Sequence, residues 1–351
     1  MAFRWLVNAI LLGLPMGTTV GVLRGIDIHR ASIGQSPLFD GSDSDLIGGG
    51  SGSGSSTAAD DDITPGDNNI TTSQYCQKSL EINPATKGTH YIFNPNQWGW
   101  TEGTEGSLCM NISTFNNHTY ATNTTAPDFS VTWQYPAGDD TAPVHAYPNI
   151  KLSSDNLPVK LSKMKSLTMD IEWSYGIGTT PVAATNITSL TTNLVNANVA
   201  VDMFLDSSKS ASQNSTKASF EFMVWFAMIG DSAEPIGLQQ GSLQTQVLNN
   251  VTLSVFFLCI IFRVCPQLTC FLSDLYAGQN DLEQYVLTWL APVTTEKFSG
   301  DIMPLFTAVL EANNATFPTS DDYLGSLQMG SEAFYSNVNV TFSVPAFSVD
   351  L

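Results

Sequence analysis

The chain has 351 residues, of which 43% are hydrophobic, so it is long enough for one large or two small domains and can bury a sizeable core. Its formal net charge is −19 at pH 7, with only 13 lysine and arginine residues. This composition excludes nucleic acid as an expected partner, because phosphate binding needs clustered basic side chains.

Residues 1–23 have the pattern of a secretory signal. Arg4 precedes an apolar run from Trp5 to about Leu23, and the small residues Thr19 and Gly21 suit cleavage after Gly21. The run is also nearly long enough to span a bilayer as an uncleaved anchor. Both interpretations stay open: a cleaved signal makes the protein extracellular, and an anchor leaves it membrane-bound with the domain outside.

Asn-x-Ser/Thr sequons are numerous along the chain and agree with secretion, since they accept N-linked glycans on surface loops of secreted proteins. The nine sequons begin at Asn69, Asn111, Asn117, Asn123, Asn186, Asn214, Asn250, Asn314 and Asn339.

Residues 24–74 are dominated by Gly, Ser and Asp, as in DGSDSDLIGGGSGSGSSTAADDDITPGDNN. Such a segment cannot bury enough apolar surface to fold, so it is predicted to be a disordered linker. From residue 75 onward the composition changes, and residues 75–351 are predicted to form one domain.

Within this domain, short apolar or alternating runs are separated by Gly, Asn, Ser and Pro. They include HYIFNPNQWGW, FSVTWQY, SLTMDIEWSY, NANVAVDMFLD and VNVTFSV. Several short strands with turn signals between them predict an all-β sandwich of two sheets.

The run NANVAVDMFLD, residues 196–206, places alternate side chains on opposite faces of a strand. Ala197, Val199, Val201, Met203 and Leu205 take the core face. The other face carries Asn196, Asn198, Ala200, Asp202 and Phe204.

The next strand, FEFMVWFAM, residues 220–228, carries a single acid, Glu221, in an otherwise apolar run. Phe220, Phe222, Val224 and Phe226 form its core face, so Glu221, Met223, Trp225 and Ala227 share the other face. That face has no lysine or arginine, although a carboxylate is rarely buried without a partner.

One good helix candidate follows, in FSGDIMPLFTAVLEANN. Helical spacing relates Ile302, Leu305, Phe306, Val309 and Leu310, and the preceding Ser299 is the predicted cap.

Several motifs together resemble glycoside hydrolase family 12, from residue 75 to the C-terminus. NPNQWG resembles the family's N-N-x-W-G strand, and VHAYPN resembles its V-K-S-Y-x-N segment. The family's W-S-Y … N-V-x-Y-D-L-F pair resembles WSY followed by ANVAVDMF. Its nucleophile strand, E-x-M-I-W-L … P-I-G, resembles EFMVWF followed by PIG. DLYAGQN, FSGD and YLGSLQMGSEAF resemble the later motifs. Ser331 and Ala333 depart from the family's G-T-E-P-F.

The resemblance implies an all-β jelly-roll sandwich of two antiparallel sheets, similar to concanavalin, with a concave substrate cleft and one short helix. It implies Glu221 as nucleophile, Glu332 as general acid/base and Asp202 as the residue that orients the nucleophile. A retaining glycosidase needs two such carboxyl groups, roughly 5–5.5 Å apart. At that distance ionised Glu221 raises the pKa of Glu332 and keeps its proton available.

The resemblance also assigns residues to the substrate. Trp98, Met223 and Trp225 would provide apolar surface in the cleft, and Asn96 and Gln328 would hydrogen-bond to sugar hydroxyls. The alternative for Trp98 and Trp225 is that they pack partly in the core.

The family often links its N-terminal strand by a disulfide, which here would join Cys76 and Cys109. No cofactor and no metal are expected, because His90, His118 and His145 are scattered and no H-x-x-x-H or C-x-x-C spacing occurs. The expected protein is a monomer whose partner is a β-1,4-linked polysaccharide, with a membrane involved only if residues 1–23 stay as an anchor.

The expected function is hydrolysis of plant cell-wall β-glucan, either cellulose or xyloglucan, by a secreted retaining endo-β-1,4-glucanase. The alternative is a catalytically silent carbohydrate-binding protein on the same fold. The presence of both Glu221 and Glu332 favours the enzyme, since a lectin does not need that pair.

Residues 255–272, VFFLCIIFRVCPQLTCFL, interrupt the match to the family. The segment holds Cys259, Cys265 and Cys270, and its apolar part is too short to span a bilayer. It is also too apolar for an exposed loop. Our hypothesis is an in-frame intron translated in the gene model; the alternative is a genuine insertion that packs on the outer sheet.

Overall fold

The computed structural model describes residues 70–351, except 116–119, 138–143, 250–251 and 254–269. The predicted signal segment and most of the predicted linker therefore lie outside the described residues. Residues 70–74 of that linker belong to the folded domain, because Ile70–Tyr75 forms strand β1 and pairs with β3. The sequence hides this strand because four of its six side chains are exposed and polar.

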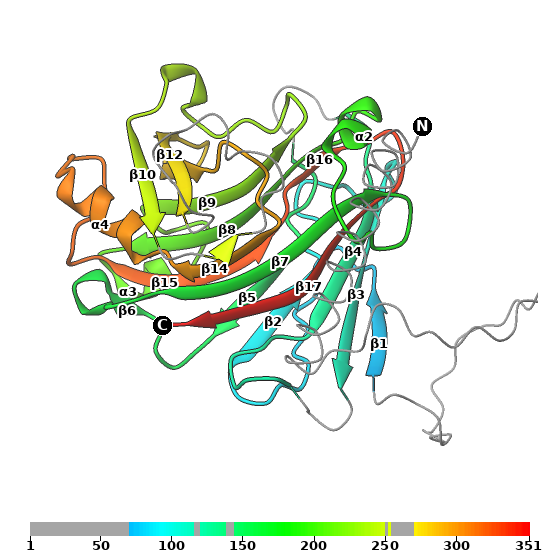
Figure 1. The fold of residues 1–351 in the computed structure, drawn as a ribbon, viewed down its shortest axis with the longest axis horizontal. Helices are drawn as coiled ribbons and strands as arrows, with labels where there is room; N and C mark the ends of the chain where they lie inside the picture. The colour runs from blue at the N-terminus through cyan, green and yellow to red at the C-terminus, as the bar shows by residue number, and fades with distance from the viewer. Residues whose placement is uncertain (1–69, 116–119, 138–143, 250–251, 254–269) are drawn as a thin grey trace, which may run out of the picture.

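The strands form two sheets, one of seven strands and one of ten. The seven-stranded sheet has the order β1, β3 (Ser107–Phe115), β4 (Asp128–Gln134), β17 (Val340–Asp350), β7 (Thr168–Ile177), β14 (Lys297–Asp301) and β11 (Thr252–Leu253). Figure 1 shows β17, in red, running between β7 and β4 through the middle of this sheet.

The ten-stranded sheet carries the acidic strands. Its order is β10 (Gln244–Asn249), β12 (Cys270–Gln279), β13 (Tyr285–Leu290), β9 (Phe220–Ile229), β8 (Asn196–Asp206), β15 (Tyr323–Gly330), β5 (Asn149–Ser153) and β2 (His90–Asn94), with β16 (Ala333–Tyr335) paired to β8 and β6 (Val159–Lys160) paired to β15. The expected all-β sandwich of two sheets is confirmed. The sheets are not purely antiparallel, however, because β13 and β9 are paired in parallel.

Large aromatic side chains from both sheets fill the space between them. Trp133 and Trp173 come from the seven-stranded sheet, and Phe222 and Trp289 come from the ten-stranded sheet; each is at most 1% exposed. Full burial of one such side chain contributes about 1.5–3 kcal/mol, so this core is the main source of stability.

The structure has more helices than the single one expected. Besides α4 (Met303–Glu311), it contains two short helices, α2 (Ile187–Thr192) and α3 (Lys209–Ser212), and two 3₁₀ turns, Leu161–Lys163 and Leu238–Gln240. Both short helices begin at a polar cap, since Asn186 accepts a hydrogen bond from Ser189 N and Ser208 accepts one from Ala211 N.

The predicted cap of α4 is wrong. Ser299 lies in β14, where its hydroxyl donates to Asp170, and the helix begins after Ile302. Asp301 instead accepts hydrogen bonds at Oδ1 from the backbone N–H groups of Met303 (2.8 Å) and Leu167 (2.9 Å).

The alternation predicted for β9 holds as far as a bulge. Val199 pairs with Ala227 and the next residue, Ala200, pairs with Trp225, so Phe226 is an extra residue in β9. The bulge turns Ala227 into the main core, 1% exposed, instead of onto the face of Glu221 as the alternation predicts. Residues N-terminal to the bulge keep the predicted faces.

Residues 255–269 of the predicted intron lie outside the described residues. Residues 270–272 are described and begin β12, where they pair with residues 247–249 of β10.

Candidate active site

Three adjacent strands bring two acids and a glutamine together on the outer face of the ten-stranded sheet, the face turned away from the main core. Glu221 stands on β9, Asp202 on β8 and Gln328 on β15, and the register aligns Asp202 with Gln328. Gln328 donates from Nε2 to Asp202 Oδ2 at 3.1 Å. The parity of the strands therefore gathers these side chains as the sequence predicted.

Glu332 joins this group from the segment between β15 and β16. It is tied to Asn198 of β8 by three hydrogen bonds. Its backbone N–H donates to Asn198 Oδ1 at 2.8 Å, its carbonyl accepts from Asn198 N at 3.2 Å, and its Oε2 accepts from Asn198 Nδ2. Asn198 is completely buried.

Glu221 also faces an asparagine. Asn280, in the turn between β12 and β13, donates from Nδ2 to Glu221 Oε2 at 3.3 Å and to Gln284 Oε1 at 2.9 Å. Gln284 is buried and anchored by donation to the carbonyls of Ser215 and Ala218, both at 2.8 Å. The carboxylate thus sits against a rigid polar turn.

Burial and mutual repulsion make these carboxyl groups hard to ionise. Burial raises the pKa of Glu221 to about 7, with the Asn280 hydrogen bond acting in the opposite direction. Burial and then the charge of Glu221 raise the pKa of Glu332 to about 8, against the hydrogen bond from Asn198. Burial and the charge of Glu221 also raise the pKa of Asp202 well above its usual range.

No cation relieves this repulsion within the part of the chain that the structure describes. The ion pairs of the described residues join Lys160 to Asp321 and Lys297 to Glu172. Neither includes Glu221, Glu332 or Asp202. Asp202 Oδ1 is buried and has no hydrogen-bond partner among the described residues. A group this costly to assemble is typical of a functional site.

Tyr147 also lies among these acids. Burial raises its pKa well above the usual range, and the charges of Asp202, Glu332 and Glu221 raise it further. Its hydroxyl donates to Ala200 O at 3.3 Å. Tyr147 belongs to the VHAYPN motif, but neither it, Asn198 nor Asn280 was assigned a role from the sequence.

Met223 and Trp225 share the predicted face with Glu221 but are almost fully buried, 5% and 3% exposed. They form a small apolar cluster with Ala200, Val286 and Leu290, separate from the main core. Trp225 Nε1 donates to Met223 Sδ at 3.4 Å. Trp225 is therefore buried, but on the face of Glu221 and not in the main core.

Asn96 reaches the site through Tyr147. Its Nδ2 donates to Tyr147 O at 3.2 Å and its own carbonyl accepts from Tyr147 N at 2.9 Å. Asn96 has a left-handed backbone (φ 43°), which asparagine tolerates well. Nearby Trp98 is 56% exposed, so its ring surface is available for a ligand.

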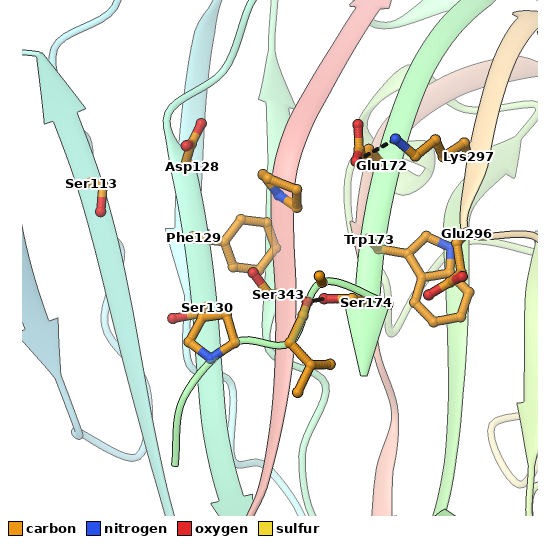
Figure 2. Close-up of a pocket in the computed structure, with 14 residues that line it drawn as sticks. Ser113, Asp128, Phe129, Ser130, Glu172, Trp173, Ser174, Glu296, Lys297 and Ser343 are labelled. Carbon is orange, nitrogen blue, oxygen red and sulfur yellow. Dashed lines mark hydrogen bonds and ion pairs between the residues drawn. The ribbon is translucent and has the colours of Figure 1, made fainter. Parts of the chain in front are cut away.

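A hollow of about 270 Å³ lies elsewhere, against the seven-stranded sheet (Figure 2). Three of its charged side chains are already engaged: Lys297 pairs with Glu172 at 2.6 Å, and Glu296 accepts from Thr185 N at 2.6 Å. None of the predicted site residues lines this hollow. The candidate active site is therefore the group formed by Glu221, Glu332 and Asp202.

The disulfide expected between Cys76 and Cys109 is present and joins the segment after β1 to β3. Among the described residues, no cluster of His, Cys, Asp and Glu is arranged to hold a metal ion. The described helices are all too short or too polar to cross a membrane.

A comparison with family models identifies the class of protein, a glycoside hydrolase. Residues 89–351 match the model of glycosyl hydrolase family 12, and the chain belongs to that family. The sequence resemblance is thereby confirmed.

Curated relatives give a finer comparison. The chain is 29% identical over 278 residues to a probable xyloglucan-specific endo-beta-1,4-glucanase A of Aspergillus fumigatus, covering 79% of this chain and 91% of the relative. It is 27% identical over 267 residues to the xyloglucan-specific endo-beta-1,4-glucanase A of Emericella nidulans, covering 76% and 87%.

Solved structures share the fold. The family 12 endoglucanase 3 of Trichoderma harzianum matches with a TM-score of 0.56 at 22% identity, over 82% of this chain and 99% of its own. A family 12 xyloglucanase of Bacillus licheniformis matches with a TM-score of 0.54 at 17% identity, over 79% and 99%.

Proposed function

We propose that this family 12 hydrolase is a retaining endo-β-1,4-glucanase, with Glu221 as nucleophile and Glu332 as general acid/base. The supporting observation is the pair of carboxyl groups on the outer face, each held by an asparagine. Burial and then the charge of ionised Glu221 raise the pKa of Glu332, so Glu332 keeps its proton when Glu221 has lost its own. This order suits a nucleophile beside an acid.

In the first step, ionised Glu221 attacks the anomeric carbon of the sugar and forms a glycosyl-enzyme ester. Glu332 gives its proton to the glycosidic oxygen, and the shortened chain leaves with that proton. In the second step, Glu332 takes a proton from water, whose oxygen attacks the anomeric carbon and releases Glu221. The second step restores both groups to their starting protonation states.

Asp202 has the role of orienting Glu221 in this proposal. It stands on the adjacent strand, and Gln328 holds its Oδ2. Because the pKa of Asp202 is raised, Asp202 keeps its proton when Glu221 ionises. The repulsion between these two carboxyl groups is thereby lowered.

The substrate-binding residues follow the same proposal. Trp98 offers an exposed ring on which a sugar ring can stack, and Asn96 and Gln328 supply polar groups at the site. Buried Met223 and Trp225 form the apolar floor beneath the sugar bound next to Glu221.

Xyloglucan is the proposed substrate, with unbranched cellulose as the second candidate. The names of the curated relatives support xyloglucan, and one similar solved structure is described as an endo-1,4-beta-glucanase and cellulase. The test is to incubate the purified protein, encoded by the mature message, with xyloglucan, barley β-glucan and carboxymethyl cellulose and to measure reducing ends. Fastest release from xyloglucan is expected; activity on none of the three would contradict the proposed function.

Export from the cytoplasm is also proposed. The Cys76–Cys109 disulfide supports it, since disulfides persist in oxidising compartments, as do the sequons. N-terminal sequencing of the protein recovered from the culture medium tests this. A chain starting near residue 22 would support a cleaved signal, whereas protein found only in membranes with residues 1–23 intact would show an anchor.

We further propose that residues 255–272 are a translated intron and that the protein without them is the active form. Residues 270–275 of β12 pair with β10 in the structure. In the spliced chain, residues 270–272 are absent, and only residue 273 and those after it could pair with β10. Sequencing the transcript between Asn250 and Asn280 tests the idea directly. A mature message that still encodes CIIFRVCPQLTC would overturn it.

A further inference from the structure

Asn198 uses both ends of its side-chain amide on a single residue, Glu332. Its Oδ1 accepts from the Glu332 backbone N–H at 2.8 Å, and its Nδ2 donates to Glu332 Oε2. The backbone of Asn198 adds a third bond, to the Glu332 carbonyl at 3.2 Å. Because the side chain of Asn198 is completely buried, no water competes for these bonds.

These contacts fix which way the amide points. Since Oδ1 must face the backbone N–H of Glu332, the NH₂ group must face the carboxyl group, and an NH₂ group can only donate. A donor directed at Oε2 disfavours a proton on that oxygen. The proton of the acid form therefore belongs on Oε1, the oxygen that Asn198 leaves unoccupied.

We propose that Asn198 is a positioning residue that fixes the orientation of Glu332 and places its transferable proton on Oε1. The inference rests on the proposed role of Glu332 as the acid/base. Asn198 does not contact the reacting atoms itself. It acts through Glu332, by holding the carboxyl group and by making its charged form less costly.

Other titratable groups also surround Glu332. Glu221 approaches from β9, Asp202 from β8 and Tyr147 from the segment before β5, and all three interact electrostatically with one another or with Glu332. Lys151 of β5 is paired with Gln328 of β15, and His145 contacts the carbonyl of Phe334 through Nδ1 at 2.5 Å. In the described structure, neither Lys151 nor His145 forms an ion pair with Glu332. Asn198 is therefore the donor whose hydrogen bond lowers the pKa of Glu332, against the effect of burial.

The first test is the pH profile of kcat/KM for Asn198→Ala in the protein encoded by the mature message. The substrate is whichever of xyloglucan, barley β-glucan and carboxymethyl cellulose the wild type hydrolyses fastest. Hydrolysis requires Glu332 to be protonated, so the alkaline limb of the profile reports its pKa, which is about 8 in the wild type. Loss of the donor raises that pKa, so the limb should move up by about one pH unit while kcat falls.

Asn280→Ala is the matched control, because it removes the equivalent donor from Glu221. It should move the acidic limb of the profile upward and leave the alkaline limb in place. A purely structural role for Asn198 predicts a different result: lower thermal stability and lower kcat with an unmoved alkaline limb. That outcome would overturn the proposal.

A second measurement does not depend on hydrolysis. Carbon-13 NMR of the glutamate carboxyl groups, assigned with Glu332→Gln, follows the titration of Glu332 itself. Asn198→Asp keeps an acceptor for the Glu332 N–H but replaces the donor by a second acid, so the pKa of Glu332 should rise further than in Asn198→Ala. An unchanged titration in both variants would overturn the proposal. Inactivity of the wild type with a shifted titration would instead contradict only the proposed function.

Discussion

Glu221 and Glu332 differ from ordinary strand acids because they are partly buried without a cationic partner in the described structure. If they carry the chemistry, Glu332→Gln should lower kcat by about 10²–10⁴-fold and Glu221→Gln should reduce hydrolysis to near the detection limit. Glutamine keeps the shape of each side chain, so the folded state should persist. Activity assays combined with circular dichroism check both statements.

Glu234→Gln is a suitable control for these variants, since Glu234 is exposed and its carboxylate only accepts from Gln239 at 2.9 Å. It should hydrolyse at the wild-type rate. Near wild-type activity in Glu221→Gln or Glu332→Gln would refute the role given to that residue.

The raised pKa of Glu332 also affects stability. Burial and the charge of Glu221 move it from 4.5 to about 8, so between these values the folded protein holds a proton that the unfolded chain has released. The free energy of unfolding should therefore fall as the pH rises through this range. Glu332→Gln removes this contribution, so urea unfolding at several pH values should show a flatter dependence; identical slopes in both proteins would contradict the assigned shift.

The sequence predicts some of these residues better than others. The period of two in β8 and β9 places Asp202 and Glu221 on one face, and the structure agrees. Asn198 lies on the same predicted face, but no pattern shows that its amide would clamp Glu332, which is 134 residues away. Asn280 reaches Glu221 from a turn, where side-chain direction depends on tertiary packing.

At the level of elements, a strand with uniform alternation is predicted well, whereas a bulge and the start of a helix are not. The limits of β8, Asn196–Asp206, coincide with the apolar alternation NANVAVDMFLD. The bulge at Phe226 is invisible in the sequence, because Phe226 and Ala227 suit either face. The start of α4 was misplaced because Ser299 resembles a cap, whereas pairing of β14 with β7 extends the strand as far as Asp301.

Helix α4 is fastened to the ten-stranded sheet through one aromatic stack. The rings of Phe306 and Phe222 lie 4.1 Å apart and nearly parallel, and both side chains are fully buried. Phe306→Ala should lower the free energy of unfolding by about 3–5 kcal/mol through lost burial and a cavity. Urea denaturation measures this loss.

Thr307→Ala on the same helix is the control, because Thr307 is exposed. Its effect should stay within about 0.5 kcal/mol. An equal loss in both variants would contradict a specific contribution of the stack on Phe222.

For the whole molecule, the two-sheet architecture followed from the number and spacing of the short strands. The parallel pairing of β9 with β13 did not follow, because the sequence between them gives no helical crossover signal. The entry of β1 into the seven-stranded sheet was also missed, since its polar side chains resemble the linker before it.

The Cys76–Cys109 bridge ties this first strand to the sandwich across a separation of 33 residues. A Cys76→Ser and Cys109→Ser double variant should lose about 3–4 kcal/mol of stability by loop-closure entropy. Thermal unfolding measures the loss, with the wild type under reducing conditions as the comparison. A melting temperature equal to that of the oxidised wild type would contradict a stabilising role for the bridge.

The central claim is that hydrolysis proceeds through a covalent intermediate on Glu221. In a 2-deoxy-2-fluoro cello-oligosaccharide, the fluorine slows both steps, and a good leaving group restores the rate of the first step only. The glycosyl-enzyme should therefore accumulate. Peptide mass spectrometry of the inactivated protein, encoded by the mature message, should then find the sugar on the peptide FEFMVWFAM, at Glu221. A sugar attached to any other residue, or turnover whose first product has the inverted anomeric configuration, would contradict the account.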